Sequence, residues 1–230
     1  IYVLSLGRAN DKCGKTCCWL EKMGIPYTVV VEPQEEEQYK KWLKGKKGMG
    51  KIMLLPVEFK RRQNEKGNFG GIPVRNFIHQ HNINSGNKKY WLLDDNINGY
   101  MWTDKYTQMK CNSKLAFVML EDWSDNFKNL YLCGHQYSNF VIAIDMKKKV
   151  EYGQRIFSSM LIHCELPPLN EDNDIWRGKY NEDVDLSLRL LTQGFPTANF
   201  QNISSNKLQT GSCKGGNEKI YKEDAGDVKG

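Results

Sequence analysis

The strongest constraint on the fold is the order of short apolar runs in the first hundred residues. Runs rich in strand-forming residues alternate with segments of helical spacing, and glycines or prolines separate them. The expected order is a strand at 1–6, a helix at 13–23, a strand at 27–31, a helix at 35–43 and a strand at 51–55. Because strands joined by such helices form parallel βαβ units, the pattern predicts half of a doubly wound α/β sheet.

The alternation continues into a candidate ligand site. A helix is predicted at 72–84 and a buried strand at 90–93, and Asp94-Asp95-Asn96 follows this strand directly. Ligands bind at the carboxyl ends of strands in an open α/β sheet, so the motif stands where a ligand is expected. Two lysine- and glycine-rich segments, 44–50 and 60–71, are predicted to be loops.

The second half of the chain gives weaker patterns. They predict strands at 139–144 and 157–162, a helix or turn at 124–130, and an amphipathic helix at 181–192 capped by Asn181. The polar, glycine-rich stretch 204–230 is expected to be a tail with little structure. We therefore expect one domain over 1–203 followed by this tail.

The composition is that of a soluble globular protein. Hydrophobic residues make up 40% and charged residues 26%, which disfavours a disordered or membrane-embedded chain. No apolar run reaches the roughly 20 residues that span a bilayer, and no signal-peptide pattern opens the chain, so a cytoplasmic location is expected. The net charge of +6 favours a polyanionic partner, although a solvated surface explains it equally.

The seven cysteines give no sign of a zinc site. They form no CxxC pair and no cysteine/histidine cluster of metal-binding spacing. We expect reduced thiols that are mostly buried.

Two adjacent carboxylates at the end of a buried strand are costly to hold together unless a cation neutralises them. Asp94 and Asp95 are therefore candidate ligands for a divalent metal, Mn²⁺ or Mg²⁺, and Asp94 and Asn96 for the diphosphate-bearing donor that such an ion would orient. The alternative is a plain turn in which these side chains cap backbone amides.

A second acidic group opens the predicted helix at 181–192. Glu182 and Asp183 follow a glycine-containing loop with aromatic residues, where a carboxylate could deprotonate an acceptor hydroxyl as general base. The alternative is that acids in a first helical turn only interact with the helix dipole.

A nucleotide-binding P-loop is a rival interpretation of the N-terminus. Residues 9–16 (ANDKCGKT) follow a strand and precede a helix, but alanine stands where the motif needs its first glycine. Because alanine resists the backbone conformation that glycine permits, this interpretation is disfavoured.

The order of several short motifs resembles the TET/JBP-associated glycosyltransferases, a family met especially in bacteriophages. The resemblance runs through the first hundred residues, on SLGRA (5–9), GIPY (24–27), VVEP (30–33), LLP (54–56), GI (71–72), RN (75–76) and WLLDDNI (91–97). After Asn96 it rests mainly on the acidic helix at 181–185.

This resemblance implies a GT-A-like, Rossmann-type fold with a mainly parallel sheet and flanking helices. Residues 1–100 would bind a nucleotide sugar and residues 101–203 the acceptor. The implied donor-binding residues are Ser5, Arg8, Glu32, Arg75 and Asn76.

The resemblance also implies an activity. The chain would be a metal-dependent glycosyltransferase that moves a sugar to a hydroxyl, with a hydroxymethylpyrimidine base in DNA as the favoured acceptor, in the host cytoplasm if the chain is viral. The alternatives are a protein or small-molecule acceptor, and a non-catalytic module that binds nucleic acid through the basic segments.

Overall fold

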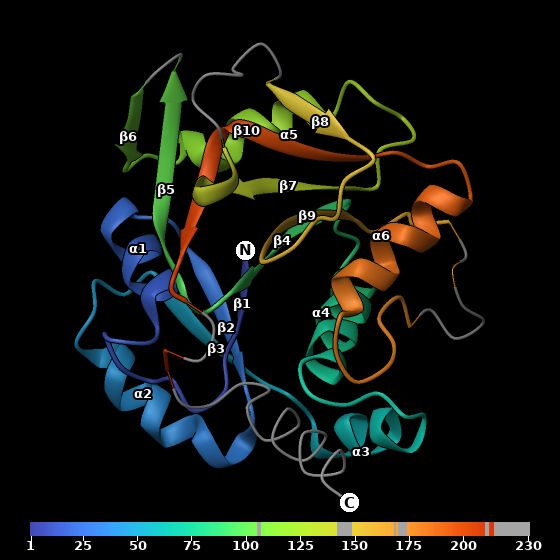
Figure 1. The fold of residues 1–230 in the computed structure, drawn as a ribbon. Coiled ribbons are helices and arrows are strands. Elements are labelled where there is room, and N and C mark those ends of the chain that lie inside the picture. The colour runs from blue at the N-terminus through green and yellow to red at the C-terminus, as the bar shows by residue number, and fades with distance from the viewer. Residues whose placement is uncertain (105–106, 142–148, 168, 170–173, 210–211, 214–230) are drawn as a thin grey trace, which may run out of the picture.

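The computed structural model describes the chain except for residues 105–106, 142–148, 168, 170–173, 210–211 and 214–230. Its centre is a ten-stranded sheet with helices on both faces (Figure 1). The helices are α1 (Lys15–Met23), α2 (Glu36–Lys44), α3 (Val57–Glu65), α4 (Ile72–Asn84), α5 (Leu115–Ser124) and α6 (Glu182–Thr192). The strands are β1 (Tyr2–Leu4), β2 (Tyr27–Val31), β3 (Gly50–Leu54), β4 (Lys89–Asp94), β5 (Ile97–Asp104), β6 (Thr107–Cys111), β7 (Leu132–Tyr137), β8 (Val150–Tyr152), β9 (Ser159–His163) and β10 (Thr197–Lys207).

The sheet is mixed, so the prediction of a mainly parallel sheet is only partly right. The strand order is β3-β2-β1-β4-β9-β7-β10-β5-β6, with β8 paired to β10. The pairs among β3, β2, β1 and β4 are parallel, as the βαβ pattern predicts. Beyond β4 the pairs are antiparallel, apart from β7 with β10.

Two of three predicted segments in the middle of the chain need correction. The first half of the expected loop at 60–71 is instead the end of α3, where Arg61 pairs with Glu58 and Glu65 along one helical face. Of the two alternatives expected at 124–130, a helix or a turn, the structure has the turn: α5 ends at Ser124, and residues 125–126 and 128–129 are turns. Of the expected strand at 139–144, residues 139–140 belong to a 3₁₀ turn and 142–144 lie outside the described residues.

Strand β10 runs past the point where the polar tail was expected to begin. It pairs with β5 on one side and β7 on the other, and Ser204 and Ser205 are fully buried. A polar sequence can occupy this central position because its backbone groups pair with strands on both sides. The end of β10 therefore belongs to the folded domain.

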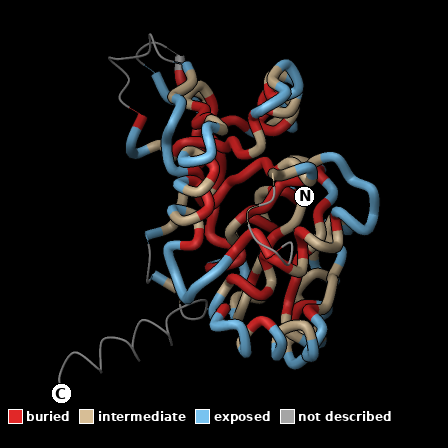
Figure 2. The backbone as a smooth tube through the Cα atoms, turned by 90° about the vertical axis from the view of Figure 1, so that its right-hand side faces the viewer, coloured by how far each residue is buried: buried red, intermediate tan, exposed pale blue. Residues whose placement is uncertain are grey.

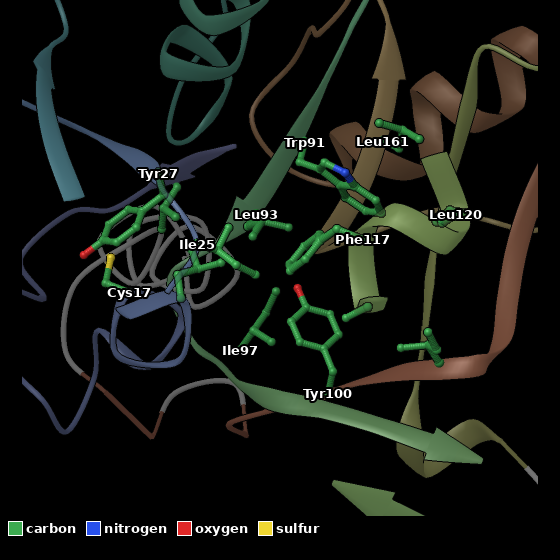
Figure 3. Packing of buried hydrophobic residues seen from close by; sticks show 14 of the residues in the cluster. Cys17, Ile25, Tyr27, Trp91, Leu93, Ile97, Tyr100, Phe117, Leu120 and Leu161 are labelled. Atoms are coloured by element: carbon green, nitrogen blue, oxygen red, sulfur yellow. The ribbon is translucent and has the colours of Figure 1, made fainter. Parts of the chain in front are cut away.

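Two apolar cores lie on opposite faces of the sheet. One contains residues of α1, α2 and α5, and the other contains residues of α4 and α6. Figure 2 shows that the buried segments run through the interior while the exposed ones form the connections. In the first core the rings of Trp91 and Tyr100 both pack edge-on against Phe117 of α5 (Figure 3). These layers hold the carboxyl ends of the central strands in fixed positions.

The cysteine prediction fails for one pair. Cys13 and Cys213 form a disulfide that joins the loop before α1 to the segment after β10. The other five cysteines are free thiols. The pairing could not be deduced from spacing, because 200 residues separate the two positions.

None of the helices in the described ranges is long and apolar enough to cross a membrane.

Candidate active site

A cavity of about 460 Å³ opens at the carboxyl ends of the parallel strands. The ends of β1, β2 and β4 form one side, and the first turns of α4 and α6 form another. Ser158, the residue before β9, and Lys207, the last residue of β10, also line the cavity. The crevice has the position that open α/β sheets use for ligands.

The cavity brings together every predicted site residue except Asn76. The lining includes Ser5, Arg8, Glu32, Arg75, Asp94, Asp95, Asn96, Glu182 and Asp183. Asn76 is fully buried beside the cavity, where its amide bonds Gln63 and the backbone of Trp176. The structure thus places Asn76 at a packing contact between α4 and the segment before α6.

Asp94 is held by two cations and a hydroxyl. Its Oδ1 lies 3.1 Å from Nη2 of Arg75, and its Oδ2 accepts bonds from Nζ of Lys207 at 2.8 Å and from the Ser158 hydroxyl at 2.7 Å. Burial alone would raise the pKa of Asp94, but Lys207 and Arg75 outweigh burial and hold this pKa well below its usual range. Asp94 is therefore a carboxylate that organises positive charge at the cavity wall.

Asp95 belongs to a separate and more buried cluster. Its Oδ1 lies 2.5 Å from Nη1 of Arg8, and its Oδ2 accepts a bond of 2.7 Å from the Ser5 hydroxyl. The hydroxyl of Tyr39 in turn donates to Ser5. Burial raises the pKa of Asp95, and the contacts with Arg8 and Ser5 offset part of that effect. The cluster fixes the loop after β1 against the end of β4.

Arg75 connects the two acidic groups that the sequence singles out. Its Nε lies 3.0 Å from Oε1 of Glu182, while its Nη2 contacts Asp94. The guanidinium lies over the ring of Trp176 at 5.1 Å, and its Nη1 has no hydrogen-bond partner among the described residues. Glu182 is thereby committed to an ion pair and is a poor candidate for a base.

Asp183 is the more available of the two acids at the start of α6. Its side chain is 20% exposed, its Oδ1 accepts from the Val184 backbone amide, and its Oδ2 lies 3.6 Å from Nε of Arg155. Asp183 lines the cavity, and its carboxylate oxygens have lone pairs that can accept a proton.

Glu32 lines the cavity directly after the end of β2. It pairs with Lys60 of α3 and accepts a bond from Gln34. This position after the second parallel strand is where α/β nucleotide sites place the carboxylate that bonds ribose hydroxyls.

The surroundings of Asp94 and Asp95 do not fit their predicted role as metal ligands. Both oxygens of each carboxylate already contact positively charged or hydroxyl groups. Within the part of the chain that the structure describes, no three His, Cys, Asp or Glu residues lie together in a way that could hold a metal ion. A divalent cation on Asp94 would also meet the charges of Lys207 and Arg75 at close range. These residues, as arranged, do not fit a divalent metal.

The contacts of Thr16 and Gly14 also exclude the P-loop interpretation. The hydroxyl of Thr16 donates to the carbonyl of Asp94 and accepts from the amide of Ile97, and the amide of Thr16 bonds the carbonyl of Asp95. A Cβ on Gly14 would lie 2.4 Å from the Trp42 ring, so the loop packs against α2. Thr16 braces the turn at 94–96 and is not free to bind magnesium.

Two important lining residues were missed from the sequence. Lys207 lies in the expected tail, and Ser158 precedes a strand whose first residue was misplaced by two positions. Ser158 and Asn181 are the described non-glycine residues with positive φ, at 61° and 57°, and both line the cavity. Such strained backbone often occurs at functional sites, but it leaves no clear signal in a sequence.

The chain has matches among solved structures and among family models. Among solved structures, the chain is similar to the apo form of mouse xyloside xylosyltransferase 1, with a TM-score of 0.43, 11% identity, and coverage of 84% of this chain and 81% of that chain. A search of curated proteins finds no match. The family model described as TET-Associated Glycosyltransferase matches residues 1–216, which include all of the lining residues. The chain therefore belongs to the TET-associated glycosyltransferase family.

Proposed function

We propose that the cavity binds a nucleotide-sugar donor in a GT-A-like manner and that the chain transfers the sugar to a hydroxyl acceptor. The observation that carries the proposal is the convergence of the ends of β1, β2 and β4 with the acidic start of α6 around one cavity. The first three elements supply a nucleotide-binding crevice, and α6 supplies a carboxylate across from it.

The donor would lie along the strand ends. Glu32 would bond the ribose, and Arg8 and Arg75 would face the diphosphate with guanidinium groups that match phosphate geometry. Ser5, Asp94, Asp95 and Asn96 would form the floor between them. These contacts involve no divalent metal.

Asp183 would act as the general base, with Glu182 as the residue that positions Arg75. As the acceptor oxygen bonds to the anomeric carbon, its proton passes to Asp183. The bond between that carbon and the phosphate oxygen breaks, and its electron pair leaves on the nucleoside diphosphate. Such an in-line displacement inverts the sugar configuration.

The favoured acceptor is a hydroxymethylpyrimidine in DNA. The net charge of +6 suits a polyanion. At the cavity, Tyr137 stacks with Phe140, which is 62% exposed. An exposed ring beside a cavity is suited to stacking with a base that has been flipped out of a duplex.

Several basic side chains of the lysine-rich segments already pair within the fold. Lys46 contacts Asp11, Lys60 contacts Glu32, and Lys66 contacts Asp174. Because these contacts neutralise part of their charge, the segments by themselves give limited support to a purely DNA-binding module.

The test is a transfer screen with a panel of nucleotide sugars and with DNA that contains 5-hydroxymethyluracil or 5-hydroxymethylcytosine. Mass spectrometry of the released nucleosides is expected to show one added sugar on the modified base. Donor hydrolysis without this product would move the acceptor to a protein or small-molecule hydroxyl. The absence of both hydrolysis and transfer with every donor would contradict the proposed activity.

A further inference from the structure

The end of β10 brings a lysine to the position where the predicted metal was expected. Nζ of Lys207 lies 2.8 Å from Oδ2 of Asp94 and 2.8 Å from the Ser158 hydroxyl. It also lies 5.6 Å from the centre of the Tyr137 ring. The Lys207 side chain is 17% exposed and lines the cavity, so its ammonium group is fixed but reachable by a ligand.

A second cation lies on the other oxygen of the same carboxylate. Arg75 contacts Oδ1 of Asp94, is 7% exposed in its side chain, and keeps Nη1 without a hydrogen-bond partner among the described residues. A buried guanidinium donor without a partner is costly, and an anionic ligand in the cavity would relieve that cost. Asp94 therefore holds two positive groups next to each other at the wall of the cavity.

We propose that Lys207, held by Asp94 beside Arg75, supplies the positive charge that binds the donor diphosphate, and that donor binding needs no divalent cation. The proposal rests on the proposed function, because it takes the cavity to be the donor site. It assigns Lys207 as a catalytic residue that contacts the leaving group, and Asp94 and Ser158 as positioning residues.

The chemistry of transfer explains why a fixed ammonium suffices. When the bond between the anomeric carbon and the phosphate oxygen breaks, the electron pair stays on the diphosphate, whose negative charge increases. A preorganised cation near that oxygen stabilises the charge without reorganising during the reaction. A metal ion performs the same task in other sites, and here the ammonium and guanidinium already occupy both oxygens of Asp94.

The first arm of the test measures binding to the whole chain. Calorimetry with each common nucleoside diphosphate is run in EDTA and again with Mn²⁺, and the spectrum of free Mn²⁺ is followed by electron paramagnetic resonance. We expect the same dissociation constant, within about twofold, in both buffers. We also expect no protein-bound Mn²⁺ beyond what the free nucleotide binds.

The second arm compares lysine variants by the same calorimetry in EDTA. Lys207→Ala is expected to weaken nucleoside diphosphate binding about tenfold or more, since a charge-assisted bond is lost. Lys207→Arg keeps the charge and should lie between this variant and the wild type. The matched control is Lys89→Ala, because Lys89 is 21% exposed and pairs with Asp125 outside the cavity.

The outcomes separate this inference from the proposed function. Binding that appears only with Mn²⁺ would overturn the metal-free role of Lys207 and leave the donor site in place. Equal binding by Lys207→Ala and the control, with circular dichroism showing both folded, would also overturn it. No binding of any nucleoside diphosphate in either buffer would contradict the donor site itself.

Discussion

Nζ of Lys207 lies 2.8 Å from Oδ2 of Asp94, although 113 residues separate them in the chain. Strand β5 begins at Ile97, three residues after Asp94, and Lys207 of β10 is the antiparallel partner of Ile97. This pairing brings Lys207 next to the acidic motif. The last strand is thus part of the site, and the acidic motif is completed by a residue from the other end of the domain.

Asp183→Asn removes the proposed base while keeping size and polarity. We expect kcat for transfer to fall about hundredfold or more, because general base catalysis contributes at least that much. The donor dissociation constant should change little. Steady-state kinetics and calorimetry measure the two effects, with the exposed Asp122→Asn, outside the cavity, as control. Wild-type turnover in the Asp183 variant would contradict the assignment.

Asp95→Ala leaves the Arg8 guanidinium without its counter-ion at a site where the two side chains are 14% and 6% exposed. Removing one partner of such a pair is expected to lower the free energy of unfolding by about 3 kcal/mol. Asp125→Ala breaks a pair whose acid is 60% exposed and should cost less than about 1 kcal/mol. Urea denaturation compares them, and equal losses would show that Asp95 is not a structural brace.

The stability of the fold should fall as the pH is lowered from about 6.5 toward 4. Burial lowers the pKa of His135 from 6.5 to about 4, and the bond to the Ala116 carbonyl offsets little of this. Between these values the unfolded chain binds a proton that the folded chain does not. The stabilisation is therefore complete above pH 6.5 and is lost by about 1.4 kcal/mol per pH unit below it.

His135→Gln tests the origin of this slope. The histidine stacks on Trp91 and contacts the Ser159 hydroxyl, so some stability is lost at every pH. The pH dependence between 4 and 6.5 should nevertheless become shallower by about 1 kcal/mol per unit. Denaturation curves at a series of pH values give the unfolding free energy as a function of pH. The same slope of this free energy against pH in both proteins would show that His135 does not cause the pH dependence.

Cys213→Ser removes the link between the segment after β10 and the loop before α1. The unfolding free energy is expected to drop by about 2–4 kcal/mol under non-reducing conditions and to be unaffected when a reductant is present. Thiol titration of the denatured wild type should give five groups without reduction and seven after it. Seven groups without reduction would show that the disulfide does not form.

The parallel half of the sheet could be predicted because helices join each of its strands to the next one in the sequence. The predicted limits of β2 and α4 agree with the observed ones. By contrast, β5 and β7 both pair with β10, which lies far from them in the sequence. Strand β6 is exposed at residues 107–110 and so shows no apolar pattern. Their place is set by tertiary pairing rather than by local periodicity.

The distinction between local pattern and tertiary pairing also explains which site residues could be predicted. Residues that directly follow parallel strands could be predicted, because the topology gathers the carboxyl ends of these strands at one edge of the sheet. Asn76 was predicted to bind the donor together with Arg75, its neighbour in the sequence. Successive residues of a helix point about 100° apart. Arg75 therefore faces the cavity, whereas Asn76 faces Gln63 and Trp176. Lys207 was missed because no local pattern distinguishes a functional lysine in a polar strand.

The most direct measurement is a crystal structure of the chain with a nucleoside diphosphate that binds in calorimetry. We expect the diphosphate within ion-pair distance of Arg75 and Lys207, and the ribose beside Glu32. A nucleotide bound away from the carboxyl ends of β1, β2 and β4 would contradict the proposal that this cavity is the donor site.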